Sequence, residues 1–424
     1  MYDLLLKNAW VVDPLNSVNG VADVAIQDSK IAKVQRDITE EAKEVIDFTG
    51  KTLQPGIIDS HVHLGEMWGS PFGPRMLAMN GVTTCLDMAG PLENILDNVP
   101  KYGVGINMAI LQFASPPFTF KDANPSQQEM IDLIDKSLEE GALGVKLLGG
   151  HYPLEPEVSS LLIRTALERR AYVAWHAGTT KNGSNINGMI EAVKMADGYP
   201  MHLAHINAYC RGAIKDAMEE TAIAIDLLKA NPNIFCESYV SPKNGTRLTC
   251  DKDGKIQSKV TGNCLRAFGF TEDKDGVRAA LLAGKAFVVY DAGGYSDLMT
   301  GEEALRRWEA ADTNVGGSFN INPPLPRIAL AQAKRDDGSF VVDAISTDGG
   351  CIPGAVSRKT GHLESQRICT EDLFEPGPYA PFGKQGSPLR RRRRRYHCLR
   401  LRYSDACGFL HRRPQSSLQR RIGF

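Results

Sequence analysis

The stretch Pro55-Gly56-Ile57-Ile58-Asp59-Ser60-His61-Val62-His63 decides the fold. A proline–glycine breaker precedes a short apolar run, which predicts that a strand begins at Ile57. Because side chains alternate along a strand, His61 and His63 leave it on the same face, two residues apart. Two imidazoles at this spacing are suited to hold one metal ion. The stretch therefore predicts a strand with metal ligands at its carboxyl end.

Further apolar stretches also finish on residues that bind metal or transfer a proton. These are Lys146 after Leu143-Gly144-Val145, His176 after Tyr172-Val173-Ala174-Trp175, His205 after His202-Leu203-Ala204, and Asp348 after Ala344-Ile345-Ser346-Thr347. Catalytic groups of α/β barrels lie at the carboxyl ends of the barrel strands. The pattern predicts one site at that end of a barrel.

The strand and helix patterns alternate after Pro55, which is typical of βα units around a parallel sheet. The expected barrel strands are 57–59, 83–87, 106–112, 143–147, 172–176, 202–205, 234–239 and 344–347. Ser126 and Glu129 form a capping-box pattern before an amphipathic run that stops at Gly141. Further helices are expected at 157–170, 187–197 and 213–230. Eight such strands predict a TIM (β/α)8 barrel of the α/β class.

The sequence falls into three regions that differ in composition and in their secondary-structure patterns. Residues 1–54 contain short strands and predict an N-terminal part of a small β-sandwich. Residues 55–365 predict the barrel, with an insertion at about 240–340 that includes a helical stretch near 302–311. This connection is too long for an ordinary loop, so we expect a functional insertion or a lid. Residues 366–424 predict an irregular, basic and disordered tail, and the sandwich is expected to be incomplete there.

Composition excludes several classes of protein. An apolar fraction of 42% and 40 glycines among 424 residues suit a globular α/β enzyme. No apolar run approaches the roughly 20 residues of a membrane span, and the N-terminus lacks a secretory pattern. Nine cysteines without CxxC spacing predict reduced thiols. We therefore expect a cytoplasmic protein.

The basic C-terminus hides an acidic body. Residues 384–424 hold 12 arginines and one lysine against one aspartate, a net charge of +12, so the remainder of the chain carries −13. The arginine run at 390–395 has two interpretations, a nucleic-acid-binding surface and a solvated tail. We favour the tail, because the segment lacks helix or strand periodicity.

The candidate ligands together predict a centre with two divalent ions. The ligands are His61, His63, His176, His205 and Asp348. Lys146 would bridge the ions if carbon dioxide carbamylated it to an anionic group. Two cations lower the pKa of a shared water, so the expected reaction is attack of a metal-bridging hydroxide on an amide carbonyl. Asp348 would shuttle the proton to the leaving nitrogen, and Tyr152 would donate to the oxyanion.

Several neighbouring residues have two interpretations. Tyr152 is equally consistent with an ordinary loop aromatic. His202, three residues before His205, is expected to point to the opposite face of its strand and to be structural. Asp59 either orients a ligand or forms a strand-end turn, and Asn207 either binds substrate or caps a strand end.

In these motifs the sequence resembles the amidohydrolase superfamily, specifically its dinuclear hydantoinase, dihydropyrimidinase, dihydroorotase and D-aminoacylase-like members. The motifs are the opening stretch 55–63, Gly81-Val82-Thr83-Thr84, Gly144-Val145-Lys146, Trp175-His176-Ala177-Gly178, His202-Leu203-Ala204-His205 and Ser346-Thr347-Asp348-Gly349. The resemblance, over residues 2–355, implies a TIM barrel with a small β-sandwich. It also implies one zinc on His61 and His63, another on His176 and His205, a carboxylated Lys146 between them, and Asp348 as ligand and proton shuttle.

The resemblance leaves the substrate open. We expect hydrolysis of a cyclic amide, as by a hydantoinase or dihydroorotase. The loop after Lys146 looks closer to the Tyr-Pro loop of D-aminoacylases, so a deacylase of linear N-acyl-D-amino acids or of isoaspartyl-type dipeptides is an alternative. A non-catalytic barrel scaffold for protein interactions is a third. A small-molecule amide is the expected partner, without membrane or nucleic acid, and a homo-oligomer stays open.

Overall fold

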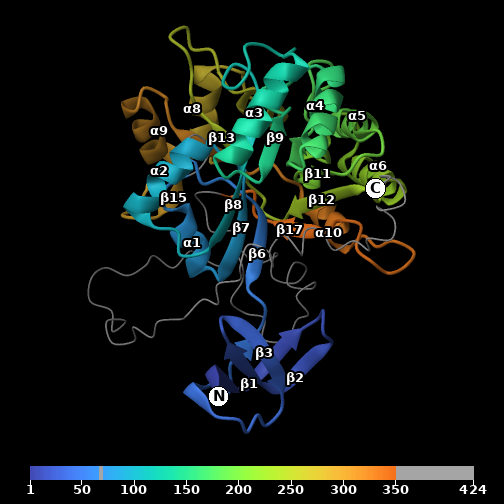
Figure 1. Ribbon diagram of the computed structural model, residues 1–424. Coiled ribbons are helices and arrows are strands. Elements are labelled where there is room, and N and C mark those ends of the chain that lie inside the picture. Colours follow the sequence, from blue (N-terminus) through green and yellow to red (C-terminus); the bar gives the residue numbers. More distant parts are fainter. Residues whose placement is uncertain (66–69, 350–424) are drawn as a thin grey trace. The chain divides into compact units, whose positions relative to one another are not determined.

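The computed structural model of this chain describes residues 1–65 and 70–349 (Figure 1). The predicted basic tail at 366–424, and with it the predicted incomplete return of the sandwich, lies outside the described residues. The described chain divides into two compact units. Of the described residues, one unit contains 1–58 and 81–84, and the other contains 59–65, 70–80 and 85–349. No helix in the described ranges combines the length and apolar character that a bilayer crossing requires.

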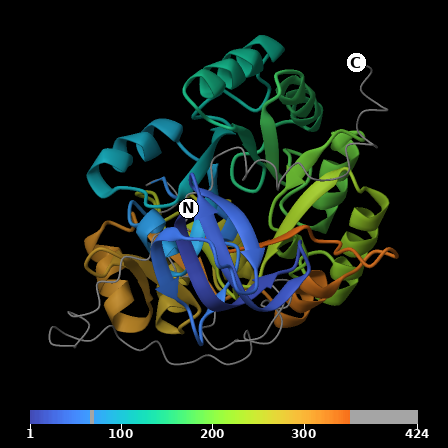
Figure 2. The same cartoon turned by 60° about the horizontal axis from the view of Figure 1, so that its bottom comes forward.

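The N-terminal unit is built on a five-stranded sheet, drawn in blue in Figure 2. Its strands are β1 (Tyr2–Asp13), β2 (Val18–Gln27), β3 (Lys30–Gln35), β4 (Ala42–Asp47) and β5 (Thr52–Leu53). The order is β3-β2-β1-β4, with β5 also paired to β1. Alternating apolar residues of β1 and β2, including Leu6, Val11 and Val24, bury one face. This sheet confirms the predicted small β domain.

The second architectural element is a parallel eight-stranded barrel. Its strands are β6 (Ile57–Val62), β7 (Val82–Ala89), β8 (Asn107–Ala114), β9 (Gly144–Leu148), β10 (Tyr172–His176), β11 (Met201–Leu203), β12 (Ile234–Tyr239) and β17 (Ala344–Ser346). Each strand pairs with the next one along the chain. A parallel bridge between Val62 and Gly349 joins the first strand to the last. The TIM barrel is therefore confirmed.

Helices follow most of the barrel strands and lie outside them (Figures 1 and 2). They are α1 (Gly73–Met79), α2 (Leu92–Tyr102), α3 (Gln127–Glu139), α4 (Pro156–Glu168), α5 (Ile186–Ala196), the 3₁₀ turn η1 (Ile206–Tyr209), α6 (Ala217–Ala230) and α10 (Pro324–Gln332). Ser126 caps α3 in the predicted capping box. Outward strand residues such as Leu147 and Trp175 pack against the helices in the main core.

Helix α6 begins four residues later than expected. The side chain of Asp216 caps it by accepting the N–H of Met218. The preceding loop is instead wrapped around the buried carboxylate of Glu220, which accepts backbone N–H groups from residues 212, 214 and 215. These local hydrogen bonds compete with helix formation and delay it.

The segment between β12 and α10 folds into a small subdomain. It contains β13 (Asn244–Arg247), α7 (Lys259–Ala267), α8 (Lys274–Leu282), β14 (Ala286–Asp291), β15 (Ser296–Met299), α9 (Gly301–Ala310) and β16 (Gly316–Phe319). The four strands form an antiparallel sheet in the order β13-β16-β14-β15. Its own apolar core includes Trp308, whose indole N–H donates to the carbonyl of Leu248 at 2.9 Å. The predicted helical stretch near 302–311 corresponds to α9.

Candidate metal centre

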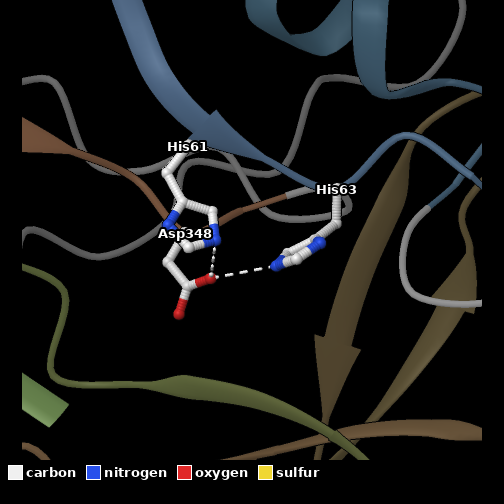
Figure 3. Close-up of side chains that lie close together, drawn as sticks. All are labelled: His61, His63 and Asp348. Carbon is white, nitrogen blue, oxygen red and sulfur yellow. Dashed lines mark hydrogen bonds and ion pairs between the residues drawn. The ribbon is translucent and has the colours of Figure 1, made fainter. Parts of the chain in front are cut away.

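His61, His63 and Asp348 converge at the carboxyl ends of β6 and β17 (Figure 3). Oδ1 of Asp348 lies 3.1 Å from Nε2 of His63 and 3.3 Å from Nε2 of His61. One ligand atom from each residue lies within 4.8 Å of the others. Backbone bonds that close the barrel hold this arrangement, because Asp348 N–H donates to the His61 carbonyl and His63 N–H donates to the Gly349 carbonyl.

A buried carboxylate determines which nitrogen of His61 is free. Oε1 of Glu237 lies 2.6 Å from Nδ1 of His61. Since a carboxylate only accepts, we assign the imidazole proton to Nδ1. Burial first, and Lys146 second, lower the pKa of His61 to about 3, so the ring is neutral. Its unprotonated Nε2 faces Asp348.

This geometry fits a cation. An unprotonated nitrogen and a carboxylate oxygen at 3.3 Å repel each other unless a positive charge lies beside them, and either the Lys146 ammonium, 3.0 Å from Nε2 of His61, or a metal cation can supply it. Burial alone would raise the pKa of Asp348, but His61 and His63 outweigh it and hold that pKa well below its usual range. Two imidazoles and an ionised carboxylate are a donor set that suits Zn²⁺.

Lys146 lies in β9 with its side chain almost completely buried, at 1% exposure. Its Nζ is 3.0 Å from Nε2 of His61 and 3.4 Å from the carbonyl of Met88. Burial lowers the pKa of Lys146 to about 8, against the opposing influence of Asp348 and Glu237. The neutral fraction of Lys146 at neutral pH is therefore larger than that of an ordinary lysine, and the neutral amine is the form that reacts with carbon dioxide.

His176 and His205 form a second pair beside the first. Nδ1 of His176 lies 2.9 Å from Nε2 of His205, and the His205 ring stacks on His61 with centroids 5.1 Å apart. The hydroxyl of Ser184 lies 2.8 Å from Nε2 of His176. Burial lowers the pKa of His205 to about 4 and that of His176 well below its ordinary value. Both imidazole rings are therefore neutral, which is the form that binds a metal ion.

The structure gathers all six predicted ligands but does not join them into one group. Within residues 1–65 and 70–349, the only His, Cys, Asp and Glu group with metal-ligand spacing is His61, His63 and Asp348. Lys146 touches this group through His61, and His205 touches it by ring stacking.

Sequence reasoning missed Glu237, which lies inside β12 and is fully buried. Besides His61, it accepts the backbone N–H of His205 at 2.6 Å and the hydroxyl of Ser346. Burial would raise the pKa of Glu237, but His61 and His202 more than compensate and hold it low. The sequence did contain a signal for Glu237, because an acidic residue in the middle of an apolar strand needs a charged or hydrogen-bonding partner. Glu237 does not stand at a strand end, where the other candidate residues lie.

His202, which we expect to be structural, packs beside Glu237 and Tyr172 and is not among the residues with metal-ligand spacing. Its Nε2 lies 3.8 Å from Oε1 of Glu237, and its Nδ1 lies 3.0 Å from the hydroxyl of Tyr172. Strand geometry ends at Leu203, and His205 adopts a left-handed backbone with φ of 38°. His202 therefore approaches the Glu237 carboxylate with its ring, whereas His205 donates to the same carboxylate from its backbone N–H.

Asp59 ties β6 to the loop that carries Asp348. Its carboxylate accepts the N–H of Thr347 at 3.1 Å, the hydroxyl of Thr347 at 2.7 Å and the N–H of His61 at 3.3 Å. Burial raises the pKa of Asp59 to about 7. Asn207 also serves the backbone, since its side-chain oxygen accepts the N–H of Tyr239 at 3.0 Å.

Tyr152 lies in the loop after β9. Its ring packs edge-on against Phe118, with centroids 5.1 Å apart, and lies beside His151. His151 in turn contacts the ring of His176 at 5.4 Å. The expected contact of Tyr152 with an oxyanion stays a prediction.

A pocket of about 290 Å³ opens next to His176. Gly150 forms part of its wall, and a Cβ at this position would overlap Nε2 of His176. The barrel contributes Gly149, Gly150, Pro153, Thr179, Gly183 and Ser184, and the inserted subdomain contributes Lys259, Asn263, Arg266 and Glu272. The pocket has room for a small molecule.

Known proteins were compared with this chain by family model, sequence and structure. No protein-family model matches it. A dihydroorotase of Streptococcus pneumoniae is 32% identical over 198 residues, which is 44% of each chain. An allantoinase of Salmonella choleraesuis is 39% identical over 99 residues, covering 22% of this chain and 21% of the relative. The chain thus spans less than half the length of these curated relatives.

Two solved structures share the fold. An N-acyl-D-glutamate deacylase from Bordetella bronchiseptica, complexed with zinc and a phosphonate inhibitor, aligns with a TM-score of 0.53 and 16% identity over 78% of this chain and 74% of its own. A D-aminoacylase aligns with a TM-score of 0.54 and 18% identity over the same shares. The two solved structures share the eight-stranded barrel fold of this chain, and over part of its length the sequence is similar to cyclic amidases of the amidohydrolase superfamily.

Proposed function

We propose that this protein is a metal-dependent hydrolase of carbon–nitrogen amide bonds, with a cyclic amide as its substrate. The observation that carries the proposal is the approach of His61 Nε2 and His63 Nε2 to one oxygen of Asp348, next to the buried Lys146. Relatives named dihydroorotase and allantoinase support a cyclic substrate.

The proposed centre holds two divalent cations, and we favour Zn²⁺ because nitrogen donors predominate. His61, His63 and Asp348 would hold one cation, and His176 and His205 the other. Lys146, carbamylated, would supply the anionic group between them. When bound, such cations polarise a carbonyl and lower the pKa of water toward neutrality.

Asp348 is the residue that would transfer the proton. Its Oδ1 faces Nε2 of both histidines, where the first cation would bind, and the lowered pKa keeps the carboxyl ionised at neutral pH. Oδ2 is then the atom to accept a proton from the attacking water and return it to the leaving nitrogen. Return of the proton requires the Asp348 carboxyl to be a stronger acid than the protonated leaving nitrogen, and its lowered pKa meets this requirement.

Other residues of the site orient the histidine ligands. Glu237 and Ser184 engage the far nitrogens of His61 and His176, so each ring presents one nitrogen to the centre. Tyr152 remains our candidate donor to the developing oxyanion. It is the second catalytic residue that we propose.

Deacylation of linear N-acyl-D-amino acids is the second candidate. Fold likeness to a D-aminoacylase and to an N-acyl-D-glutamate deacylase supports it. Both candidates use the same centre, and they differ only in whether the scissile bond closes a ring.

The test combines metal analysis with a substrate panel. Purified protein, supplied with Zn²⁺ and bicarbonate, is assayed on hydantoins, dihydropyrimidines, dihydroorotate and N-acyl-D-amino acids. We expect about two ions per chain and turnover of at least one cyclic amide. Asp348→Asn should abolish turnover, whereas Asp253→Asn, at an exposed turn, should not. Protein that binds no metal and hydrolyses nothing would instead be a non-catalytic scaffold.

A further inference from the structure

Arg211 carries a positive charge that is paired only with neutral groups. It follows η1, in the connection from β11 to α6. Its Nε donates to Oδ1 of Asn322 at 2.7 Å, and its Nη2 donates to the hydroxyl of Tyr239 at 2.9 Å. Among residues 1–65 and 70–349, no carboxylate forms an ion pair with it, and Nη1 has no hydrogen-bond partner. The carboxylate of Asp348 acts on Arg211 through space without forming an ion pair with it, and a partly buried guanidinium that lacks a directly paired anion can bind one.

A second arginine reinforces the positive charge at the same place. Arg327 is 8% exposed and donates from Nη1 to the carbonyl of Val240 and from Nε to that of Pro323. Its partners are again neutral. Two guanidinium groups therefore contact the consecutive residues Tyr239 and Val240, and no acidic side chain in the described ranges pairs with either.

The positive locus formed by Arg211 and Arg327 adjoins the candidate metal centre. Tyr239 ends β12, two residues after Glu237, so both side chains point to the same face of the strand. The Tyr239 ring centroid lies 6.3 Å from that of His205. The locus is thus one side chain away from a proposed ligand, at the carboxyl end of the barrel.

Asn322 fixes the geometry of Tyr239 and Arg211. Its amide nitrogen donates to the Tyr239 hydroxyl at 3.2 Å and to the carbonyls of Ser241 and Lys243 at 3.1 and 3.0 Å. Because Tyr239 accepts from both Asn322 and Arg211, both lone pairs of its oxygen are engaged. Its own proton is left to be donated. The pair can therefore offer N–H and O–H donors to one anion without rearrangement.

We propose that Arg211 and Tyr239 bind a carboxylate of the substrate, so that this hydrolase acts on acidic amides rather than neutral ones. The inference rests on the proposed function. One N–H of Nη1 and the second N–H of Nη2 form a planar fork that matches two carboxylate oxygens. The substrate class is then a cyclic amide or an N-acyl amino acid that bears a free carboxylate close to the scissile bond.

The test compares substrates that differ only in the carboxylate. Dihydroorotate is paired with dihydrouracil, and N-acetyl-D-alanine with its carboxamide. Wild-type protein should show a higher kcat/KM for the acidic member of the pair it hydrolyses. Arg211→Met should lower the ratio of acidic to neutral kcat/KM by about 10- to 100-fold, the worth of a charged hydrogen-bonded pair. Arg211→Lys, which keeps the charge but loses the fork, should lower it less.

Arg278→Met is the matched control. Arg278 lies in α8 of the inserted subdomain, where it pairs with Asp275 and Glu309, so its removal should leave the ratio unchanged. An equal effect of Arg211→Met on both members of a pair would overturn the proposal. A wild-type preference for the neutral member would also overturn it.

A binding measurement separates this proposal from the proposed function. Calorimetry with Asp348→Asn protein measures the affinity for dihydroorotate and for dihydrouracil without turnover. If no substrate is hydrolysed by wild type, the proposed function fails, yet this comparison still decides the role of Arg211. Tighter binding of dihydroorotate, lost in the Asp348→Asn/Arg211→Met double variant, supports a carboxylate site. Equal binding of the two ligands overturns it.

Discussion

Oε1 of Glu237 lies 2.6 Å from Nδ1 of His61, in the fully buried interior of the barrel. The same oxygen accepts the backbone N–H of His205. The Glu237 carboxylate thus determines which nitrogen of His61 is free, and it also holds the backbone of His205 in place. His61 belongs to one predicted ligand pair and His205 to the other. This contact connects β12 to β6 and β11 and controls how the centre presents its donors.

Replacement of Glu237 should weaken metal binding more than it weakens the fold. Glu237→Gln keeps the shape but removes the negative charge that makes His61 a better donor. We expect Zn²⁺ affinity to fall by about 10- to 100-fold. Competition with a chromogenic chelator measures this, and the Co²⁺-loaded protein should change its visible spectrum. Glu303→Gln, at an exposed ion pair, is the control. Unchanged affinity in Glu237→Gln would contradict the orienting role.

Replacement of Lys146 should remove one bound ion and the dependence on bicarbonate. Lys146→Met has a similar volume and no amine, so the buried site stays filled while carbamylation becomes impossible. The free energy of unfolding should change little, because an apolar group in place of a buried charge is often neutral or stabilising. Intact-protein mass under non-denaturing conditions should lose the carbon dioxide adduct. The exposed Lys194→Met serves as control, and an adduct that persists in Lys146→Met would contradict the assignment.

Asp59 should make the stability of the metal-free protein depend on pH. Burial raises its pKa to about 7 in the folded state, from about 3.9 in the unfolded chain. The folded state therefore holds this proton more tightly, so the stabilisation is complete below about pH 4 and is lost as pH rises through 7. We expect the contribution of Asp59 to the free energy of unfolding to fall by about 2 to 4 kcal/mol over this range.

Urea denaturation at a series of pH values measures this dependence. Asp59→Asn should remove the Asp59 contribution, so that the difference in free energy of unfolding between wild type and variant changes with pH, whereas the exposed Asp253→Asn should leave the dependence unchanged. The same slope in wild type and Asp59→Asn would show that another group is responsible.

Gly150→Ala should disturb His176 without unfolding the barrel. The added Cβ would overlap Nε2 of the ring and break its contact with Ser184. We expect loss of the second ion and most of the activity, while the thermal midpoint of the metal-free protein stays near that of wild type. Gly245→Ala, where a Cβ meets open space, is the matched control. Full metal content in Gly150→Ala would argue against His176 as a ligand.

Local signals explain how much of the fold was predictable. Each barrel strand is a short apolar run between breakers, and the run that predicts β10 coincides with it at both ends. The capping box at Ser126 is likewise a local signal, and it marks the start of α3. The inserted subdomain was not predicted beyond α9. Its strands β13, β15 and β16 have only four residues each, too few to show a period, and they pair across long stretches of chain.

The sequence by itself determined the eight-stranded barrel and the side chains that stand at the ends of its strands, because alternation, breakers and caps act within a few residues. Only the tertiary structure decided which of these side chains meet. Glu237 reaches His61 across 176 positions of the chain, and Arg211 reaches Asn322 across 111. Such contacts exist only once the barrel closes and the inserted subdomain folds, since both bring together residues that share no local pattern.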